Sequence, residues 1–160
     1  MDTHILPTKW ILWFHNPLDN DWTLNSYTKI DEITSIESFW ELYLRLNKSI
    51  LQDGMLFLMK DGVEPLWETE ANRNGGCWSY KVNKSDVYSS WLNLSITLCC
   101  QTLLTETSKF KYINGISISP KKLFCIIKIW NNTSNLKEVN ILNINNYDKM
   151  KCIYKAHNDR

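Results

Sequence analysis

Residues 112–130 read YINGISISPKKLFCIIKIW, and this stretch predicts two β-strands joined by a tight turn. Apolar residues recur at every second position over Tyr112–Ser119 and again over Leu123–Trp130, which is the period of a strand. The tetrapeptide Ser119-Pro120-Lys121-Lys122 separates the two runs and has the composition of a turn. We therefore expect an antiparallel hairpin.

Similar short runs recur along the chain. Further strands are predicted at Trp10–Phe14 (WILWF), Met55–Met59 (MLFLM), Cys77–Val82 (CWSYKV) and Cys152–Lys155 (CIYK), with Gly75-Gly76 as another turn signal. In CWSYKV the side chains of Trp78, Tyr80 and Val82 would share one face.

Three segments have helical spacing instead. Thr34 and Glu37 form a capping box before an amphipathic helix that carries Ile36, Phe39, Trp40 and Tyr43. Ser85-Asp86 opens a second helix with Val87, Trp91, Leu94 and Leu98 on one stripe, widened by Leu92, Ile96 and Cys99. A third helix is predicted over about Ile141–Asp148. The fold class is therefore α+β: one curved antiparallel sheet with two or three helices on its convex face. Its other face is open to a ligand.

Composition limits the function. A chain of 160 residues with 44% apolar content suits one globular domain, residues 1–160. The N-terminus MDTHILPTKW is not a signal peptide and no apolar run reaches about 18 residues, so we expect a soluble, cytoplasmic protein without membrane contact. Five cysteines without framework spacing are expected to be reduced thiols. A formal charge of +1 excludes a globally basic nucleic-acid coat and permits a focused contact.

The eight tryptophans exceed what a core of this size needs. We assign five or six of them to the core. Trp22 and Trp67 fall in connections between predicted elements, where two indoles on facing loops can sandwich a flat ring. Glu68 adjoins Trp67 and could accept hydrogen bonds from the two N–H groups on one edge of guanine. A positively charged base such as 7-methylguanine would gain a cation–π attraction from both rings.

No enzymatic role is expected. Histidines occur only at positions 4, 15 and 157, and the sequence has no Gly-rich phosphate loop, nucleophile motif, metal-binding cluster or cofactor motif. Two other classes also use such residues. A carbohydrate-binding module uses tryptophan platforms but has no need of Lys121 and Lys122, and a cap hydrolase would need paired carboxylates for a metal.

The order and spacing of several motifs carry a resemblance. These are His4, WILWF at 10–14, Trp22, SIESFWELY at 35–43, KDGVEPLWE at 60–68, GGCW at 75–78, Trp91-Leu92 and Trp130. From about His4 to His157 the chain resembles the eukaryotic translation initiation factor 4E family, and all eight tryptophans find counterparts. The resemblance implies an eight-stranded sheet with three helices behind it and a concave face that binds the 7-methylguanosine cap of messenger RNA.

The resemblance also implies residue roles. Trp22 and Trp67 would stack on the base, Glu68 and the backbone N–H of Trp67 would read its edge, and Trp130 would contact the methyl group. Lys121, Lys122 and Lys128 would serve the cap phosphates. A partner-binding surface on the back would comprise His4, Ile36, Trp40, Leu92, Asn93 and Ile96. It would take a Tyr-x-x-x-x-Leu-hydrophobic helix of a 4G-like scaffold protein or of a 4E-binding repressor.

The sequence departs from the family at several positions. Lys121 replaces an arginine, Ile126 replaces a basic residue and Cys77 replaces another arginine, so fewer positive groups face the phosphates. Asn93 replaces an acidic residue and Cys100 a glycine on the partner surface, so we expect a specialised partner or weaker binding to a generic 4G peptide. The family's longer C-terminal loop is expected to be largely absent. We expect an initiation factor that is monomeric outside its complex, with a cap-binding repressor as the alternative, and a divergent protist or giant-virus origin, in host cytoplasm if viral.

Overall fold

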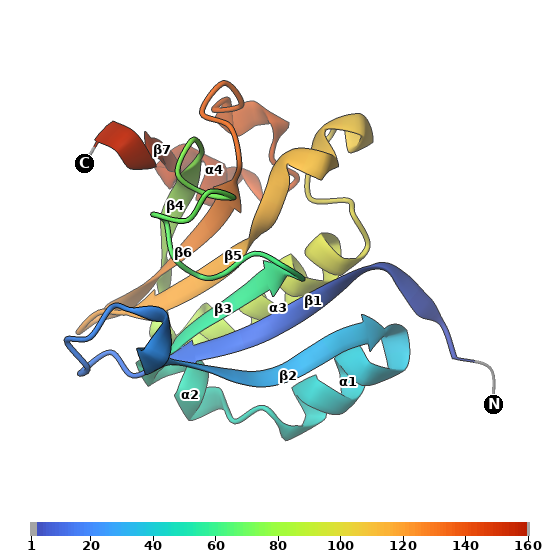
Figure 1. The fold of residues 1–160 in the computed structure, drawn as a ribbon, viewed down its shortest axis with the longest axis vertical. Helices are drawn as coiled ribbons and strands as arrows, with labels where there is room; N and C mark the ends of the chain where they lie inside the picture. The colour runs from blue at the N-terminus through green and yellow to red at the C-terminus, as the bar shows by residue number, and fades with distance from the viewer. Residues whose placement is uncertain (1–2, 160) are drawn as a thin grey trace.

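The computed structural model describes residues 3–159, and its centre is one antiparallel sheet (Figure 1). Within those residues the sheet has seven strands in the order β2-β1-β3-β5-β6-β4-β7, rather than about eight. They are β1 (Ile5–His15), β2 (Tyr27–Ser35), β3 (Met55–Lys60), β4 (Gly76–Asn83), β5 (Ile113–Pro120), β6 (Phe124–Asn131) and β7 (Ile153–Ala156). The α+β prediction is confirmed.

The helices gather on one side of this sheet. They are α1 (Ile36–Arg45), α2 (Lys48–Asp53), α3 (Val87–Cys99) and α4 (Asn146–Lys151), and short 3₁₀ turns occupy Leu24–Ser26, Lys84–Asp86, Thr107–Tyr112, Val139–Ile141 and His157–Asp159. Figure 1 shows α1, α2 and α3 behind the sheet, while the loop of residues 61–75 crosses in front of it. None of the helices in residues 3–159 is long and apolar enough to cross a membrane.

Alternation along the strands builds two apolar clusters, one on each face. Trp10 and Leu12 of β1 pack with the helices in the larger cluster, which also holds Trp78 and Trp91. The residues between them face the opposite side, where the smaller cluster contains Ile11, Trp13, Phe57, Met59, Cys77 and Trp130. Five tryptophans are buried, at 10, 13, 78, 91 and 130, as the sequence predicted. Each fully buried large apolar side chain stabilises the fold by about 1.5–3 kcal/mol.

The predicted hairpin is confirmed. In β5 and β6, Ile118 pairs with Ile127 and Pro120 with Cys125. The Lys121 backbone N–H donates to the Phe124 carbonyl at 2.8 Å and closes the turn. The hairpin therefore holds Lys121 at its tip and directs alternate residues of β6 toward the open face.

The predicted capping box is displaced by one residue. Ser35, not Thr34, is the N-cap of α1; its hydroxyl accepts from the Ser38 N–H at 3.0 Å, and the Ser38 hydroxyl accepts from the Ser35 N–H at 3.0 Å. Glu37 is unavailable for capping because its carboxylate accepts instead from the backbone N–H of His4, at 3.0 Å. The sequence pattern for a capping box has a Glu or Gln three residues after the N-cap, and Ser38 takes that place here. The pattern therefore pointed to Thr34 and Glu37, one residue too early.

Two further predictions need correction. The third helix begins at Asn146 rather than Ile141, because Asn145 caps it by accepting from the Asp148 N–H at 2.8 Å. Gly75-Gly76 is not the turn itself, since Gly76 begins β4. Only glycine fits at position 75, because the backbone of Asn131 passes close to it. A Cβ at Gly75 would lie 1.9 Å from the Asn131 carbonyl oxygen.

Candidate ligand-binding site

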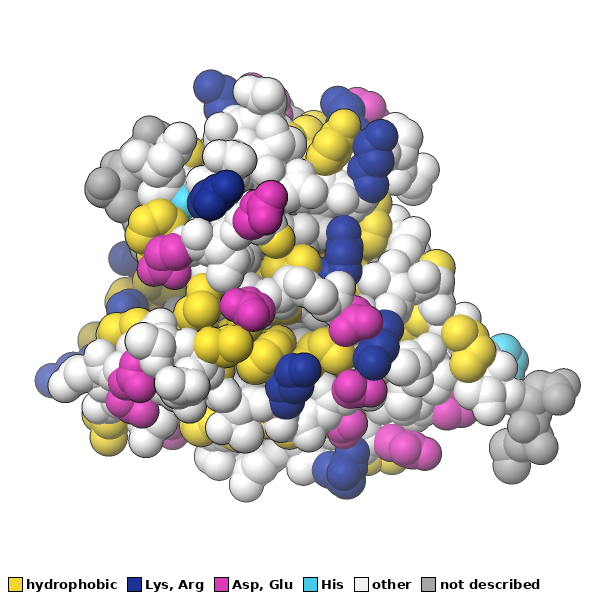
Figure 2. Space-filling view, viewed as in Figure 1, with side chains coloured by type: hydrophobic (Ala, Val, Ile, Leu, Met, Phe, Trp, Pro, Cys, Tyr) yellow, Lys and Arg dark blue, Asp and Glu magenta, His cyan; other side chains and the backbone are white. Residues whose placement is uncertain are grey.

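A pocket of about 610 Å³ opens on the face that carries the smaller apolar cluster. It is lined by Pro17, Trp22, Tyr27, Met55, Phe57, Pro65, Leu66, Trp67, Glu68, Ser119, Pro120, Lys121, Lys128 and Trp130. Six of the seven residues predicted to contact a capped nucleotide therefore line one cavity. Figure 2 shows hydrophobic side chains gathered on this face near the β1–β2 connection and the loop of residues 61–75.

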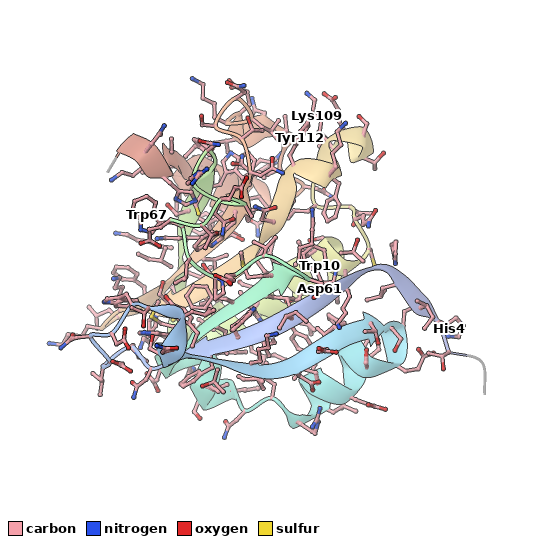
Figure 3. All side chains as sticks on the ribbon, in the orientation of Figure 1. His4, Trp10, Asp61, Trp67, Lys109 and Tyr112 are labelled. Atoms are coloured by element: carbon pink, nitrogen blue, oxygen red, sulfur yellow. The ribbon has the colours of Figure 1, made fainter. Side chains whose placement is uncertain are left out.

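The two indoles of the pocket that are not fully buried come from different loops. Trp22 lies between β1 and β2 and is 51% exposed. Trp67 lies between β3 and β4, is half-buried, and packs on the smaller cluster. Figure 3 labels Trp67 on its loop, at the side of the sheet away from His4. The pocket thus has an aromatic group on each of two separate loops.

Two buried asparagines fix the Trp67 loop. The Asn72 amide donates to the carbonyls of Glu64 at 3.0 Å and Leu66 at 2.9 Å. The Asn114 amide, on β5, donates to the Asn72 side-chain oxygen at 2.8 Å. Both side chains are buried, so these bonds form away from water and order the backbone that carries Trp67. Sequence reasoning missed both residues, because nothing in their spacing shows which carbonyls they meet.

His15 supports the Trp22 loop and was also missed. Its imidazole lies parallel to the Trp22 indole, with ring centroids 4.3 Å apart and an interplanar angle of 13°. Its Nε2 donates to the Asp21 carbonyl at 2.8 Å, directly before Trp22. Within the loop the Thr23 N–H and hydroxyl both donate to the Asp21 carboxylate, and these bonds lower the pKa of Asp21. One face of Trp22 is thereby covered by protein.

The carboxylate of Glu68 gives the pocket a negative edge. Glu68 is exposed, and no hydrogen bond or ion pair to its side chain is recorded among residues 3–159. Its charge acts on Tyr27, which also lines the pocket: burial raises the pKa of Tyr27 to about 12, and Glu68 and Asp21 add to the rise. Tyr27 therefore stays protonated at neutral pH, and the acceptor at this edge is Glu68.

Trp130 and two lysines complete the pocket. The Trp130 indole N–H donates to the Ser117 hydroxyl at 3.0 Å. The Trp130 ring packs edge-on against Phe57, with the ring centroids 6.3 Å apart. Lys128 projects from β6 two residues earlier, on the same face as Trp130, and Lys121 comes from the hairpin. Lys122 is exposed but does not line the pocket, so the structure separates it from its neighbour.

The predicted partner residues lie on the helical side. The His4 ring lies 2.6 Å from the Glu37 carboxylate, and the His4 carbonyl accepts from the Ile36 N–H at 2.9 Å, so the N-terminal segment is fixed to the start of α1. Ile36 and Trp40 are 47% and 44% exposed.

Helix α1 is joined to α3 by a hydrogen bond from the Tyr43 hydroxyl to Ser95. Trp40 and Leu92 each lie one turn before those two residues. Leu92 and Ile96 are half-buried and Asn93 is exposed. Trp40 of α1 and Leu92 of α3 therefore lie on either side of the Tyr43–Ser95 hydrogen bond.

The described residues hold no cluster of three or more His, Cys, Asp or Glu side chains suited to a metal ion.

Comparison with known proteins identifies the family. A family model described as eukaryotic initiation factor 4E matches residues 5–160. Human eukaryotic translation initiation factor 4E is 36% identical over 104 residues, 61% of this chain and 46% of that protein. The fission yeast factor 4E-2 is 29% identical over 174 residues, 98% of this chain and 68% of that protein. The chain spans about half the length of the vertebrate relatives it matches.

Solved structures share the fold. Caenorhabditis elegans eIF4E-3, in complex with the 4E-binding protein Mextli and a cap analog, superposes with a TM-score of 0.83 at 22% identity, covering 99% of this chain and 95% of that one. Ascaris suum eIF4E-3 with m7G cap gives 0.81 at 22% identity, covering 98% and 92%. With the family model matching nearly the whole chain, the protein belongs to the eukaryotic initiation factor 4E family.

Proposed function

We propose that this protein binds the 7-methylguanosine cap of messenger RNA and recruits a scaffold factor to promote translation initiation. The observation that carries the proposal is the pocket in which two loop tryptophans, a carboxylate and two lysines meet. Human and fungal relatives are named translation initiation factors, and the Ascaris structure holds an m7G cap, which supports the same ligand here.

The base would enter between Trp22 and Trp67. His15 covers one face of Trp22, which leaves the other for the ligand. A base stacked on an aromatic ring gains roughly 1–3 kcal/mol per ring, and the positive charge of 7-methylguanine adds a cation–π attraction to both indoles. Glu68 would accept from the two N–H groups on the guanine edge, and Trp130 would contact the methyl group.

The phosphates would extend over the hairpin side of the pocket. Lys121 and Lys128 line this side and can neutralise part of the triphosphate charge. Each hydrogen bond to a charged group contributes about 1.5–3 kcal/mol net, and ordering the rim loops offsets part of this gain. Binding alone accounts for the arrangement, so the protein acts as a non-enzymatic cap receptor.

The scaffold would bind on the opposite side of the sheet. Exposed Ile36 and Trp40 on α1, with Leu92 and Ile96 on α3, suit an amphipathic helix that inserts a few apolar side chains. The worm relative forms a complex with a 4E-binding protein, which supports a partner of that kind. Such a factor acts in the cytoplasm, where capped messages are translated.

Quenching of tryptophan fluorescence tests the proposal. We expect 7-methylguanosine triphosphate to quench the intact protein with micromolar or tighter affinity, and guanosine triphosphate to bind at least about tenfold more weakly because it lacks the cation–π term. Trp67→Ala should weaken binding of the methylated ligand by about tenfold or more. Equal affinity for the two nucleotides would refute the proposed role of the indole pair.

A further inference from the structure

A second cleft, of about 600 Å³, lies on the helical side of the sheet. One wall is a polar stripe on the α3 side that includes Ser90, Asn93 and Thr97. The opposite wall belongs to residues 143–151, and Tyr80 of β4 also lines the cleft. The cleft matches the first pocket in volume but shares none of its residues.

Tyr80 supplies an unused polar group. Its side chain is only 4% exposed, and no hydrogen bond from its hydroxyl to any of residues 3–159 is recorded. Burial raises the pKa of Tyr80 and the charge of Asp148 raises it further, so the phenol stays protonated. Because Tyr80 lines the cleft, its hydroxyl oxygen is available to accept a hydrogen bond from a donor bound there.

Asp148 supplies a buried negative charge beside it. The residue is 7% exposed, and its carboxylate accepts from the Asn145 amide at 2.9 Å. The Lys151 ammonium is 3.7 Å away, but it donates at 2.9 Å to the Lys81 carbonyl. An ionised carboxylate offers about four acceptor positions, so Asp148 can accept further bonds.

The rest of the lining adds acceptors and one more charge. Asp86 is exposed at the cleft, and no side-chain hydrogen bonds to Asn93 or Ser90 are recorded in the part of the chain that the structure describes. Two carboxylates against one lysine leave the lining with a net negative charge. A ligand that suits it is positively charged and carries several N–H donors.

We propose that this cleft binds an arginine side chain presented by a partner protein. A guanidinium has five donors in a rigid plane and is less strongly hydrated than an ammonium, so it can bond a carboxylate, a hydroxyl and an amide oxygen together. Asn93 belongs both to this cleft and to the predicted partner surface, so one partner could contact both sides of α3. The contact of one partner with both sides of α3 rests on the proposed function, whereas the charge complementarity of the cleft does not.

The test uses N-acetyl-arginine amide, with N-acetyl-citrulline amide as a neutral probe of the same shape. Each is titrated into isotope-labelled protein and followed by amide NMR shifts. We expect the arginine probe to bind with millimolar affinity, as suits so small a ligand, and to shift resonances of Ser90, Asn93 and Tyr147. The citrulline probe should cause no such shifts.

Three variants locate the site. Tyr80→Phe removes one hydroxyl and should weaken the arginine probe by about threefold or more. Asp148→Asn keeps an acceptor for Asn145 and should weaken it by about tenfold or more. Ser90→Leu introduces a bulky side chain into the cleft and should block the probe. Glu106→Gln removes a charge outside the cleft and should leave binding unchanged, and circular dichroism establishes folding in each case.

Three results would overturn the assignment: no arginine shifts in the intact protein, equal shifts with citrulline, or arginine binding that survives all three cleft variants in folded form. The probe requires neither a cap nor a partner protein, so its failure would leave the cap proposal standing. Cap-analogue quenching, measured on the same samples, tests that proposal separately and should be unaffected in all four variants.

Discussion

At the residue scale, the stacking tryptophan depends on a histidine beneath it. His15 is fully buried in β1, and its Nε2 donates to the Asp21 carbonyl, so its Nδ1, which has no hydrogen-bond partner among the described residues, carries no proton in the neutral ring. The imidazole thus contributes a flat surface and one hydrogen bond to the Trp22 loop. Those two contributions can be separated by substitution.

We predict that His15→Ala weakens binding of 7-methylguanosine triphosphate by about fivefold to tenfold, because both contributions are lost. His15→Phe keeps a flat ring under Trp22 and should cost only about threefold, the value of one neutral hydrogen bond. Fluorescence titration of both variants checks the order. A larger loss for phenylalanine than for alanine would show that the ring does not position Trp22.

Glu68 offers a sharper test of base reading. Glu68→Gln replaces one acceptor oxygen with an N–H₂ group that would face a donor of the base, so affinity for 7-methylguanosine triphosphate should fall by at least about tenfold. Glu64→Gln is the matched control, since Glu64 is exposed on the same loop and does not line the pocket. Isothermal calorimetry measures both. Equal losses in the two variants would indicate a general charge effect.

At the element scale, the β5–β6 hairpin carries one lysine into the pocket and another away from it. Lys121 lines the cavity and Lys122 does not. We predict that Lys121→Ala weakens the triphosphate ligand while scarcely affecting 7-methylguanosine, and that Lys122→Ala has little effect on either. Since only two lysines line the pocket, affinity should depend weakly on salt. Titrations of both ligands at two salt concentrations decide, and a dominant Lys122 would contradict the geometry.

The same elements show how far the sequence reaches. Strands with a run of apolar residues were predicted, because such runs are typical of strands buried on one or both faces of a sheet. Strand β2 was not, since it lies at the sheet edge, and of its nine residues only Ile33 and Ser35 are buried. Helix α2 has six residues, too few to show a helical period.

The candidate site divides in the same way. Trp22, Trp67 and Glu68 were predicted because tryptophans in loops are unusual and because the family motifs surround them. Asn72, Asn114 and His15 were missed, since each acts on a backbone carbonyl or a ring that is close only in the folded chain. Residue type identifies groups that contact a ligand more readily than groups that support them.

At the scale of the whole molecule, the sheet separates two surfaces. The smaller apolar cluster and the ligand pocket occupy one face, while the larger cluster and α1–α3 occupy the other. Trp10 and Trp13 lie three residues apart on β1, yet they belong to different clusters. The two clusters share no residue and the sheet lies between them, so a substitution on one face should barely alter binding on the other.

Trp40→Ala tests that separation. Trp40 is 44% exposed and packs edge-on against Phe39, while Phe39 and Tyr43 are buried beneath it, so its removal should leave the core intact. We predict loss of binding to a Tyr-x-x-x-x-Leu-hydrophobic peptide, because an exposed indole is a typical hot spot of helix-in-groove binding. Cap affinity should stay within about twofold of the unaltered protein, since no residue of the pocket changes. Both affinities are measured on protein that circular dichroism shows to be folded, and retained peptide binding or lost cap binding would refute the assignment.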